Sequence, residues 1–451
     1  MEKSKFKAII VGGSVAGQTL SLAFEKANID YVLLEKHESF APEVGASIGI
    51  FANGMRVLDQ LGICNEIEAR TEPLRAMSKR DGKGNEFDYN EILSKISDRH
   101  GYTINFMERK DLLSVMYAAQ PNVSKLLCNK RVDSIEQGDN GVKVTTSDGS
   151  EYEGDIVVGA DGVWSKVRQM MWNAMDADKS LPKDVAKDLA KDKTVLTCEY
   201  ACVFGISYNV MSIPAGHNNL VFRHGSSFLI LSGKNGTVYW FYFEKLDKKY
   251  AVPNIPRYTQ EDAVKTCEKQ LDAIIAENVT FRELWDNRKS AIKVALEEGV
   301  MRRWHYSRFV VLGDAAHKMT PNMGQGGNSA IESAAILSNC LKSALDKNNQ
   351  QLNSKQIDEC LSLYQAERRK RIKSVSTRAG DATRMEALDS MTKVIMARYI
   401  IPSLGEKLIL KLIGDLLKEA PSLDFVDKPT RAHLVPYSDE KPKKKKSILG
   451  F

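Results

Sequence analysis

Short apolar runs around a glycine turn predict that the chain opens with strands and a helix in alternation. Residues 8–11 and 31–34 are four-residue apolar runs, which are typical of buried parallel strands. The segment 15–27 between them is compatible with a helix, so the order predicts a strand–helix–strand unit. Runs at 152–158 and 309–312 predict two further buried strands.

A different pattern lies between these last two strands. Apolar and polar residues alternate over several runs within 195–245, which predicts half-buried strands. We therefore expect a mainly antiparallel sheet inserted into the first unit. Helices are predicted at 260–277 and 328–346, and the chain is expected to be helical and highly charged from about residue 367 onward.

A glycine turn follows the first predicted strand. Residues 12–17 read Gly-Gly-Ser-Val-Ala-Gly and fill the frame G-x-G-x-x-G, with Ser14 in place of the second glycine. The first glycine permits the tight turn, the third permits close packing of helix on strand, and the helix N-terminus attracts phosphate. Glu35 ends the second strand, where a carboxylate can accept hydrogen bonds from a ribose. The competing interpretation is an ordinary turn followed by a surface glutamate.

Two more segments with glycine and aspartate follow predicted strands. Residues 155–168 contain Asp161-Gly162, and residues 308–328 contain Gly313-Asp314 and a run of glycines from Gly324 to Gly327. Both segments resemble the Asp-Gly and Gly-Asp fingerprints of the flavoprotein aromatic-hydroxylase family. With the N-terminal glycine turn they form a three-part FAD signature in the expected order.

The resemblance implies how these residues would bind FAD. Asp314 would accept hydrogen bonds from the ribityl hydroxyls, and the small residues after it would let backbone N–H groups and a helix dipole reach the flavin ring. Arg109 resembles the family's arginine at the start of a long helix near the cofactor. The competing interpretations are a helix cap for Asp314, a turn residue for Asp161 and a solvated arginine. His317 is expected to be structural.

Other segments resemble a narrower group, the fungal paxilline-type indole-diterpene and meroterpenoid epoxidases of secondary metabolism. They are residues 44–50, 53–54, 203–207, 227–229 and 423–437. In that group Glu35, Gly49, Arg109, Asp314 and the position of Gly327 match FAD-contacting positions. The resemblance implies that NADPH or NADH reduces the flavin, binding transiently near Asp161, and that one atom of O₂ is inserted into a bulky apolar substrate. Epoxidation of an alkene is the expected reaction.

The predicted fold class is α/β. A Rossmann-like FAD-binding domain is interrupted by a mainly antiparallel substrate-binding sheet and is followed by a helical C-terminal segment. The expected divisions are 1–75, 101–180 and 296–375 for the FAD-binding domain, 76–100 and 181–295 for the substrate part, 376–440 for the helical segment and 441–451 for a basic tail. The candidate cofactor-binding residues are Gly12, Gly13, Gly17, Glu35, Gly49, Arg109, Asp161, Asp314, Gly324, Gly326 and Gly327.

The substrate sheet is expected to be lined with aromatic side chains. They are Phe204, Phe222, Phe228, Trp240, Phe241 and Phe243, most of which would belong to the core of the insert. No catalytic side chain is assigned: Tyr200 and Tyr208 are candidates, but both are better explained as ordinary sheet tyrosines. Hydroxylation of a phenol or indole ring, flavin-dependent dehydrogenation and a non-enzymatic dinucleotide-binding sensor remain as competing functions.

Composition and charge indicate the expected partners and location of the protein. A net charge of +6 over 451 residues gives no argument for nucleic-acid binding, and seven scattered cysteines predict reduced thiols rather than a metal site. A cytoplasmic location without a spanning segment is expected.

Leucines recur every fourth residue in 403–418, which predicts an amphipathic helix. It packs on the protein or, with the lysines at 443–446, holds the protein peripherally on an internal membrane.

Overall fold

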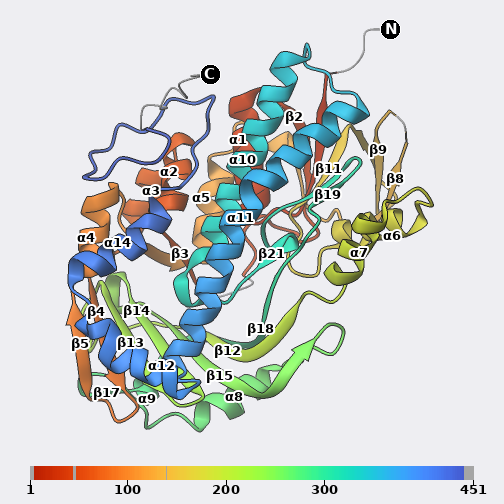
Figure 1. The fold of residues 1–451 in the computed structure, drawn as a ribbon. Helices are drawn as coiled ribbons and strands as arrows, with labels where there is room; N and C mark the ends of the chain where they lie inside the picture. Colours follow the sequence, from red (N-terminus) through yellow and green to blue (C-terminus); the bar gives the residue numbers. More distant parts are fainter. Residues whose placement is uncertain (1–4, 44–46, 139, 441–451) are drawn as a thin grey trace, which may run out of the picture.

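The computed structural model describes residues 5–43, 47–138 and 140–440, and these form two large sheets with helices around them (Figure 1). The first sheet has six strands in the order β19-β20-β11-β1-β2-β7. All of its pairs are parallel except β19 with β20. Its strands are β1 (Lys7–Val11), β2 (Asp30–Leu34), β7 (Leu126–Leu127), β11 (Ile156–Gly159), β19 (His305–Tyr306) and β20 (Phe309–Val311).

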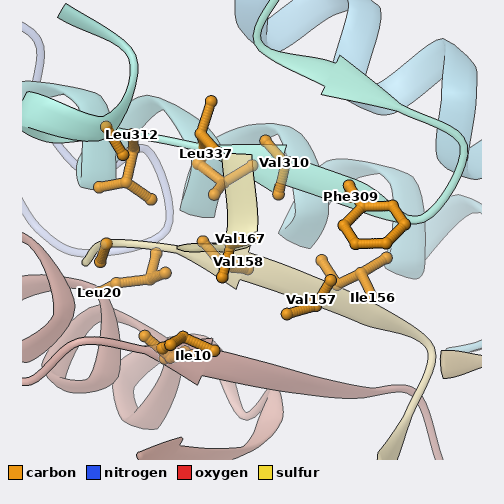
Figure 2. Close-up of a cluster of buried hydrophobic side chains, with 14 of the residues drawn as sticks. Ile10, Leu20, Ile156, Val157, Val158, Val167, Phe309, Val310, Leu312 and Leu337 are labelled. Atoms are coloured by element: carbon orange, nitrogen blue, oxygen red, sulfur yellow. The ribbon is translucent and has the colours of Figure 1, made fainter. Parts of the chain in front are cut away.

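Apolar side chains from this sheet and its helices form the first core. Figure 2 shows Ile10, Val158 and Val310 on three neighbouring strands, with Leu20 and Leu337 from helices packed around them. Burying one such side chain contributes about 1.5–3 kcal/mol. The helices here are α1 (Val15–Ala27), α6 (Lys166–Ala177), α7 (Lys183–Asp192), α10 (Gln325–Lys347) and α11 (Ser354–Glu386). Figure 1 shows α1, α10 and α11 side by side.

The second sheet has eight strands in the order β21-β18-β12-β15-β14-β13-β4-β5. All of its pairs are antiparallel except β13 with β4. Its strands are β4 (Ala76–Asp81), β5 (Glu86–Asn90), β12 (Thr197–Ser207), β13 (His217–Arg223), β14 (Ser226–Ser232), β15 (Val238–Ala251), β18 (Arg288–Val300) and β21 (His317–Lys318). Residues from three distant parts of the chain therefore build one sheet.

Both faces of the second sheet are buried. Side chains of a strand alternate between faces, so Phe241 and Phe243 of β15 lie on one face and Trp240 on the other. The first face packs toward the six-stranded unit. The second face is covered by α8 (Gln260–Glu268) and α9 (Phe281–Asp286).

Shorter elements connect the two sheets. Strands β3 (Ser47–Ile50) and β6 (Asn105–Glu108) pair with each other, and β8 (Val132–Gln137), β9 (Val142–Thr146) and β10 (Glu151–Gly154) form a small sheet. The remaining pair is β16 (Ile274–Ala276) with β17 (Val279–Thr280). The helices among these elements are α2 (Ala52–Gln60), α3 (Cys64–Arg70), α4 (Ile92–His100) and α5 (Arg109–Ala118).

The C-terminal segment is helical up to residue 417 and then extended. Its helices are α12 (Met391–Ile395), a π-helix (Met396–Ile400), α13 (Ile401–Ser403) and α14 (Glu406–Leu417). The extended part is fixed by the buried Arg56, which donates to the carbonyl of Ala420 and pairs with Asp439 and Glu440. Within the described ranges, no helix is both long and apolar enough to cross a bilayer.

The structure corrects three predicted elements. The run 152–158 is two strands in different sheets, because Asp155 accepts a hydrogen bond from the N–H of Lys7 and turns the chain between them. The helix predicted at 260–277 ends at Glu268, and the apolar residues 274–276 pair as strand β16 instead, an ambiguity that short apolar runs carry. The helix predicted from residue 328 begins at Gln325.

Two segments of interest in the sequence lie outside the described residues. They are residues 44–46, which contribute to the resemblance, and the lysines at 443–446.

Candidate functional site

The glycine turn after β1 leaves no room for side chains. Gly12 has a φ of +107°, and a Cβ there would lie 2.5 Å from the carbonyl oxygen of Ala160. A Cβ on Gly17 would lie 1.9 Å from the carbonyl oxygen of Gly12. The first glycine is therefore required by conformation and the third by close packing of α1 on the turn, as the motif predicts.

The N-termini of α1 and α10 both lack a side-chain cap. No side chain among the described residues accepts a hydrogen bond from the first turn of α1, after Ser14, or of α10, after Gly324. In α6, by contrast, the hydroxyl of Ser165 accepts from the N–H of Arg168. Uncapped N–H groups at the positive end of a helix dipole bind anions, so these two helix ends fit a phosphate and an electron-rich ring.

Glu35 holds the glycine turn from the end of β2. Its buried carboxylate accepts hydrogen bonds from the N–H of Gly13 at 2.6 Å and of His37 at 2.9 Å. The competing interpretation of Glu35 as a surface residue is therefore wrong. Two carboxylate oxygens offer about four acceptor positions, so Glu35 retains capacity for a ribose hydroxyl.

Asp314 lies in a one-turn helix directly after β20, and Lys318 forms an ion pair with it at 2.6 Å. Burial alone would raise the pKa of Asp314, but Lys318, and then His317 and Arg109, lower it below its ordinary value. The side chain keeps one third of its surface exposed. Asp314 is thus an ionised carboxylate with an accessible side, which suits acceptance of hydroxyl donors.

Arg109 connects the glycine turn to Asp314. It is the first residue of α5 and donates a hydrogen bond to the hydroxyl of Ser14 at 2.6 Å. Burial lowers the pKa of Arg109, while the charges of Asp314 and Glu35 act in the opposite direction. The guanidinium is therefore partly buried within reach of both carboxylates, and the competing interpretation of a solvated arginine is wrong.

Strand β3 meets the N-terminus of α10 at Gly49. The Asn328 amide donates to the carbonyls of Gly49 at 2.9 Å and Gly324 at 2.7 Å. A Cβ on Gly327 would lie 2.6 Å from Ile48, whereas a Cβ on Gly326 would meet nothing within 4 Å. Gly326 therefore faces open space at the start of α10, where a ring could approach the backbone.

Asp161 lies beside the glycine turn but is engaged locally. A Cβ on Gly12 would lie 2.9 Å from its Cα. Its carboxylate accepts from the hydroxyl of Ser165 and from the N–H groups of Lys166 and Val167, so it caps α6. The turn role is present, and a contact with FAD stays a prediction.

His317 has the environment of a structural residue. It is buried beside Trp304, and its Nε2 lies 3.0 Å from the hydroxyl of Ser333. Burial, and then Arg368, lower the pKa of His317 to about 3, so the ring is neutral.

The face of the second sheet that packs toward the six-stranded unit carries some of the predicted aromatics. Phe204, Phe222, Phe241 and Phe243 lie on it. Phe228 and Trp240 lie on the opposite face, against α8 and α9, and are core residues of the insert.

The two candidate tyrosines differ in their surroundings. Tyr200 is buried in β12, and burial, then Asp389, raise its pKa. Tyr208 donates to the carboxylate of Glu108, the residue before Arg109, and Lys289 lies over its ring. Tyr208 is therefore the tyrosine connected to the site.

Two site residues, Lys318 and Asn328, were not identified as candidates from the sequence. Lys318 stands four positions after Asp314, a spacing that brings residues together on a helical turn, and this was the available signal. Asn328 follows the glycines directly, but its contact with β3 spans 279 residues and has no local signal.

Comparisons with known proteins identify relatives of this chain. A family model described as FAD binding domain matches residues 5–379. The chain is 40% identical to FAD-dependent monooxygenase nvfK of Aspergillus novofumigatus and 42% identical to FAD-dependent monooxygenase andE of Emericella variicolor, in both cases over 96% of this chain and 90% of the relative.

Solved structures share the fold at low identity. Klebsiella pneumoniae HpxO, solved with FAD and uric acid, superposes with a TM-score of 0.75 at 21% identity, over 92% of this chain and 97% of that chain. The tetracycline destructase Tet(51) superposes with a TM-score of 0.66 at 18% identity, over 93% of this chain and 99% of that chain.

Proposed function

Because this chain belongs to the FAD-dependent monooxygenases that share the FAD binding domain, we propose that it inserts one atom of O₂ into a bulky apolar substrate. It is an FAD-dependent oxidoreductase with a mixed α/β fold, and its substrate is a small molecule. The observation that carries the choice of substrate is the apolar, aromatic face of the second sheet, which is turned toward the FAD-binding unit.

The residues present fit FAD. We propose that the uncapped N-terminus of α1 and the turn at Gly12, Gly13 and Gly17 bind the pyrophosphate, and that Glu35 binds the adenosine ribose. Asp314 would accept from the ribityl chain, with Arg109 compensating its charge. The start of α10, with Gly324, Gly326, Gly327 and the adjoining Gly49, would receive the flavin ring, and Asp161 is proposed as a further contact.

Bound FAD supplies the redox chemistry, since reduced flavin activates O₂ for transfer of a single oxygen atom. The protein's own part is to bind, orient and exclude water. The α10 dipole and its free N–H groups would stabilise negative charge at the ring, and Arg109 would offset the charges of Asp314 and Glu35. We propose NADPH or NADH as the electron donor, bound transiently near Asp161.

The proposed reaction is epoxidation of an alkene in terpenoid or indole-terpenoid secondary metabolism. It is supported by the apolar sheet face that carries Phe204, Phe222, Phe241 and Phe243. Of these four, Phe204 is only partly buried and keeps surface that could pack against a hydrocarbon skeleton. Hydroxylation of a phenol or indole ring is the second candidate. It is favoured by Tyr208 and Glu108, because this hydrogen-bonded pair next to Arg109 could accept a phenolic proton.

A screen of purified protein distinguishes these reactions. Terpenoid alkenes and matched phenols or indoles are supplied with NADPH or NADH, and nucleotide consumption and product mass are recorded. Epoxidation predicts a product heavier by one oxygen atom that retains every hydrogen and lacks one double bond. A hydroxylated ring from the aromatic panel alone would favour the second candidate, and nucleotide consumption without an oxygenated product would contradict both.

We further propose that the chain divides as its sequence suggests. Residues 1–75, 101–180 and 296–375 would form the FAD-binding domain, and 76–100 and 181–295 the substrate part. The pairing of β4 with β13, and of β5 with β4, supports the assignment of 76–100. Helix α7 gives less support to the assignment of 181–295 to the substrate part, because this helix lies against α6 of the FAD-binding unit.

We also propose peripheral association with an internal membrane, based on the amphipathic pattern of residues 403–418. In α14, Leu416 and Leu417 are buried and Ile409 and Ile413 are partly buried against the protein, so most of its apolar face is occupied. Exposed Leu408 and Leu412 support the proposal.

A further inference from the structure

The helix before α14 is apolar on its outer side. Residues 391–403 form one helical run, made of α12, the π-helix and α13, which begins where Ser390 caps it. Met391 and Tyr399 are 72% and 69% exposed, and Ile395 and Ile400 are exposed with them. Ala397 is buried on the inner side. Most of the residues that face solvent are thus large apolar ones, with Thr392, Arg398 and Ser403 beside them, whereas the outer side of an ordinary surface helix is polar.

This concentration of apolar surface is not matched elsewhere on the described molecule. Of 16 exposed large hydrophobic side chains in the described ranges, seven lie between residues 391 and 412. They are Met391, Ile395, Met396, Tyr399, Ile400, Leu408 and Leu412. Single exposed apolar residues are normal on a protein surface, but a cluster of them indicates an interaction site. Figure 1 shows α12 and α14 on the outside of the molecule, α12 beside the end of α11 and α14 beside α4.

The same stretch is positively charged. Residues 391–418 carry five cations and two anions. The cations are Lys393, Arg398, Lys407, Lys411 and Lys418, and the anions are Glu406 and Asp415. Lys393 and Lys418 pair with Asp381 and Asp415. Within the described part of the chain, Lys407 and Lys411 form no ion pair, so the protein does not neutralise these two cations beside the apolar surface.

We propose that the outer side of helix 391–403, with Leu408 and Leu412, docks on an anionic lipid surface. This inference extends the membrane association proposed above from α14 to a helix that sequence periodicity did not single out. The apolar side chains would enter the boundary between headgroups and acyl chains, and the lysines and arginine would lie at the headgroups. Binding would be reversible and weakened by salt.

Two other occupants fit less well. In a symmetric dimer each copy presents the same patch, so the cations of one copy would face those of the other. The chain's own end, residues 441–451, contains five lysines and would meet the same repulsion. An anionic bilayer offers both the apolar depth and the opposite charge.

Vesicle flotation of the FAD-loaded full chain tests this surface. Vesicles of phosphatidylcholine alone are compared with vesicles in which part of the lipid is phosphatidylserine, at low and high NaCl. The test variant is Ile395→Gln with Tyr399→Gln. The matched control is Leu363→Gln with Met211→Gln, because those side chains are equally exposed but lie outside 391–412. A chain ending at Glu440 measures the contribution of the lysine tail.

The wild type and the control are expected to float with the anionic vesicles at low salt. The test variant should bind roughly tenfold or more weakly, because two apolar side chains no longer enter the lipid. The proposal is overturned if the wild type stays unbound, if test and control variants weaken equally, or if removing the tail alone abolishes binding. A wild-type dimer that the test variant converts to monomer assigns the surface to a second copy. Bound FAD and nucleotide consumption, measured on each variant, separate this outcome from failure of the proposed activity.

Discussion

At the scale of single residues, the proposed binding of FAD depends on carboxylates that are ionised and still accessible. Asp314 is the clearest of these, since Lys318 and Arg109 keep it charged at the end of β20. Its replacement in Asp314→Ala should remove most bound FAD. Losing a hydrogen bond to a charged group costs on the order of 2–3 kcal/mol, or roughly 30- to 100-fold in affinity.

Titration of FAD into the purified variants, followed by flavin fluorescence, measures this loss. Asp346→Ala is the control, because Asp346 also pairs with a lysine four positions away but lies on the exposed part of α10. Full flavin occupancy of Asp314→Ala at low added FAD would remove Asp314 from the site.

Glu35 is expected to contribute less. In Glu35→Gln the amide keeps one acceptor oxygen, but the charge-assisted bond to a ribose is lost, and with it on the order of 1–2 kcal/mol of binding. The same titration should therefore show a smaller decrease in FAD affinity than for Asp314→Ala. An unchanged dissociation constant would leave Glu35 with only its observed role of holding Gly13 and His37.

Sequence and structure agree best for residues whose role is local. Gly12 is explained by its own positive φ and Gly17 by its contact with the carbonyl oxygen of Gly12, so the local motif predicted both. Lys318 carried a local signal in its four-residue spacing from Asp314, whereas Asn328 is explained by where distant segments meet, and no spacing reports that. The side of the sheet on which Phe228 and Trp240 fall was likewise invisible until the strand register was known.

At the scale of elements, a buried ion cluster holds α2, α10 and α11 together. Glu332 of α10 pairs with Arg368 and Arg371 of α11 and accepts a hydrogen bond from Asn53 of α2. In Glu332→Gln two largely buried guanidinium groups lose their counter-charge, so the free energy of unfolding should fall by about 3–5 kcal/mol. Denaturant unfolding measures this, with Glu359→Gln on the exposed side of α11 as the control.

The same cluster has a pH signature. Burial alone would raise the pKa of Glu332, but Arg371 and Arg368 lower it to about 2 from an ordinary value of 4.5. A lowered pKa gives stability that is complete above the unfolded value and is lost as pH falls toward the folded one. The melting temperature of the wild type should therefore drop between pH 4.5 and 2. A wild type and a Glu332→Gln variant with parallel pH profiles would contradict this.

The first strand, glycine turn, helix and second strand were predictable because apolar runs and a turn lie next to one another in the chain. The parallel pairing of β4 with β13 joins segments some 140 residues apart, and alternation within a strand does not specify its partner. Helix 391–403 shows the second limit. A helical pattern reports an apolar side but not whether that side faces the protein or the solvent.

At the scale of the whole molecule, the end of α11 joins the FAD-binding unit to the second sheet. The buried Glu386 accepts a hydrogen bond from Asn322, just before α10, and lies near Lys79 of β4. Burial raises the pKa of Glu386 from 4.5 to about 8. A raised pKa means that stability is highest below pH 4.5 and falls as pH rises through 8.

Glu386→Gln should remove this pH penalty, because the amide carbonyl still accepts from Asn322 and carries no charge. The variant is expected to be more stable than the wild type at pH 8 and equally stable at pH 4.5. Thermal unfolding across this range measures the difference. A variant less stable than the wild type at pH 8 would show that Glu386 is held in its ionised form.

The two units together are proposed to transfer one oxygen atom from O₂ to an apolar substrate. Isotope labelling follows that atom: an accepted terpenoid alkene, NADPH and the FAD-loaded enzyme are incubated under ¹⁸O₂ in ordinary water, and in parallel under ordinary O₂ in H₂¹⁸O. We expect a product with one heavy oxygen atom in the first experiment and none in the second. A product without label under ¹⁸O₂, or with label from water, would contradict it.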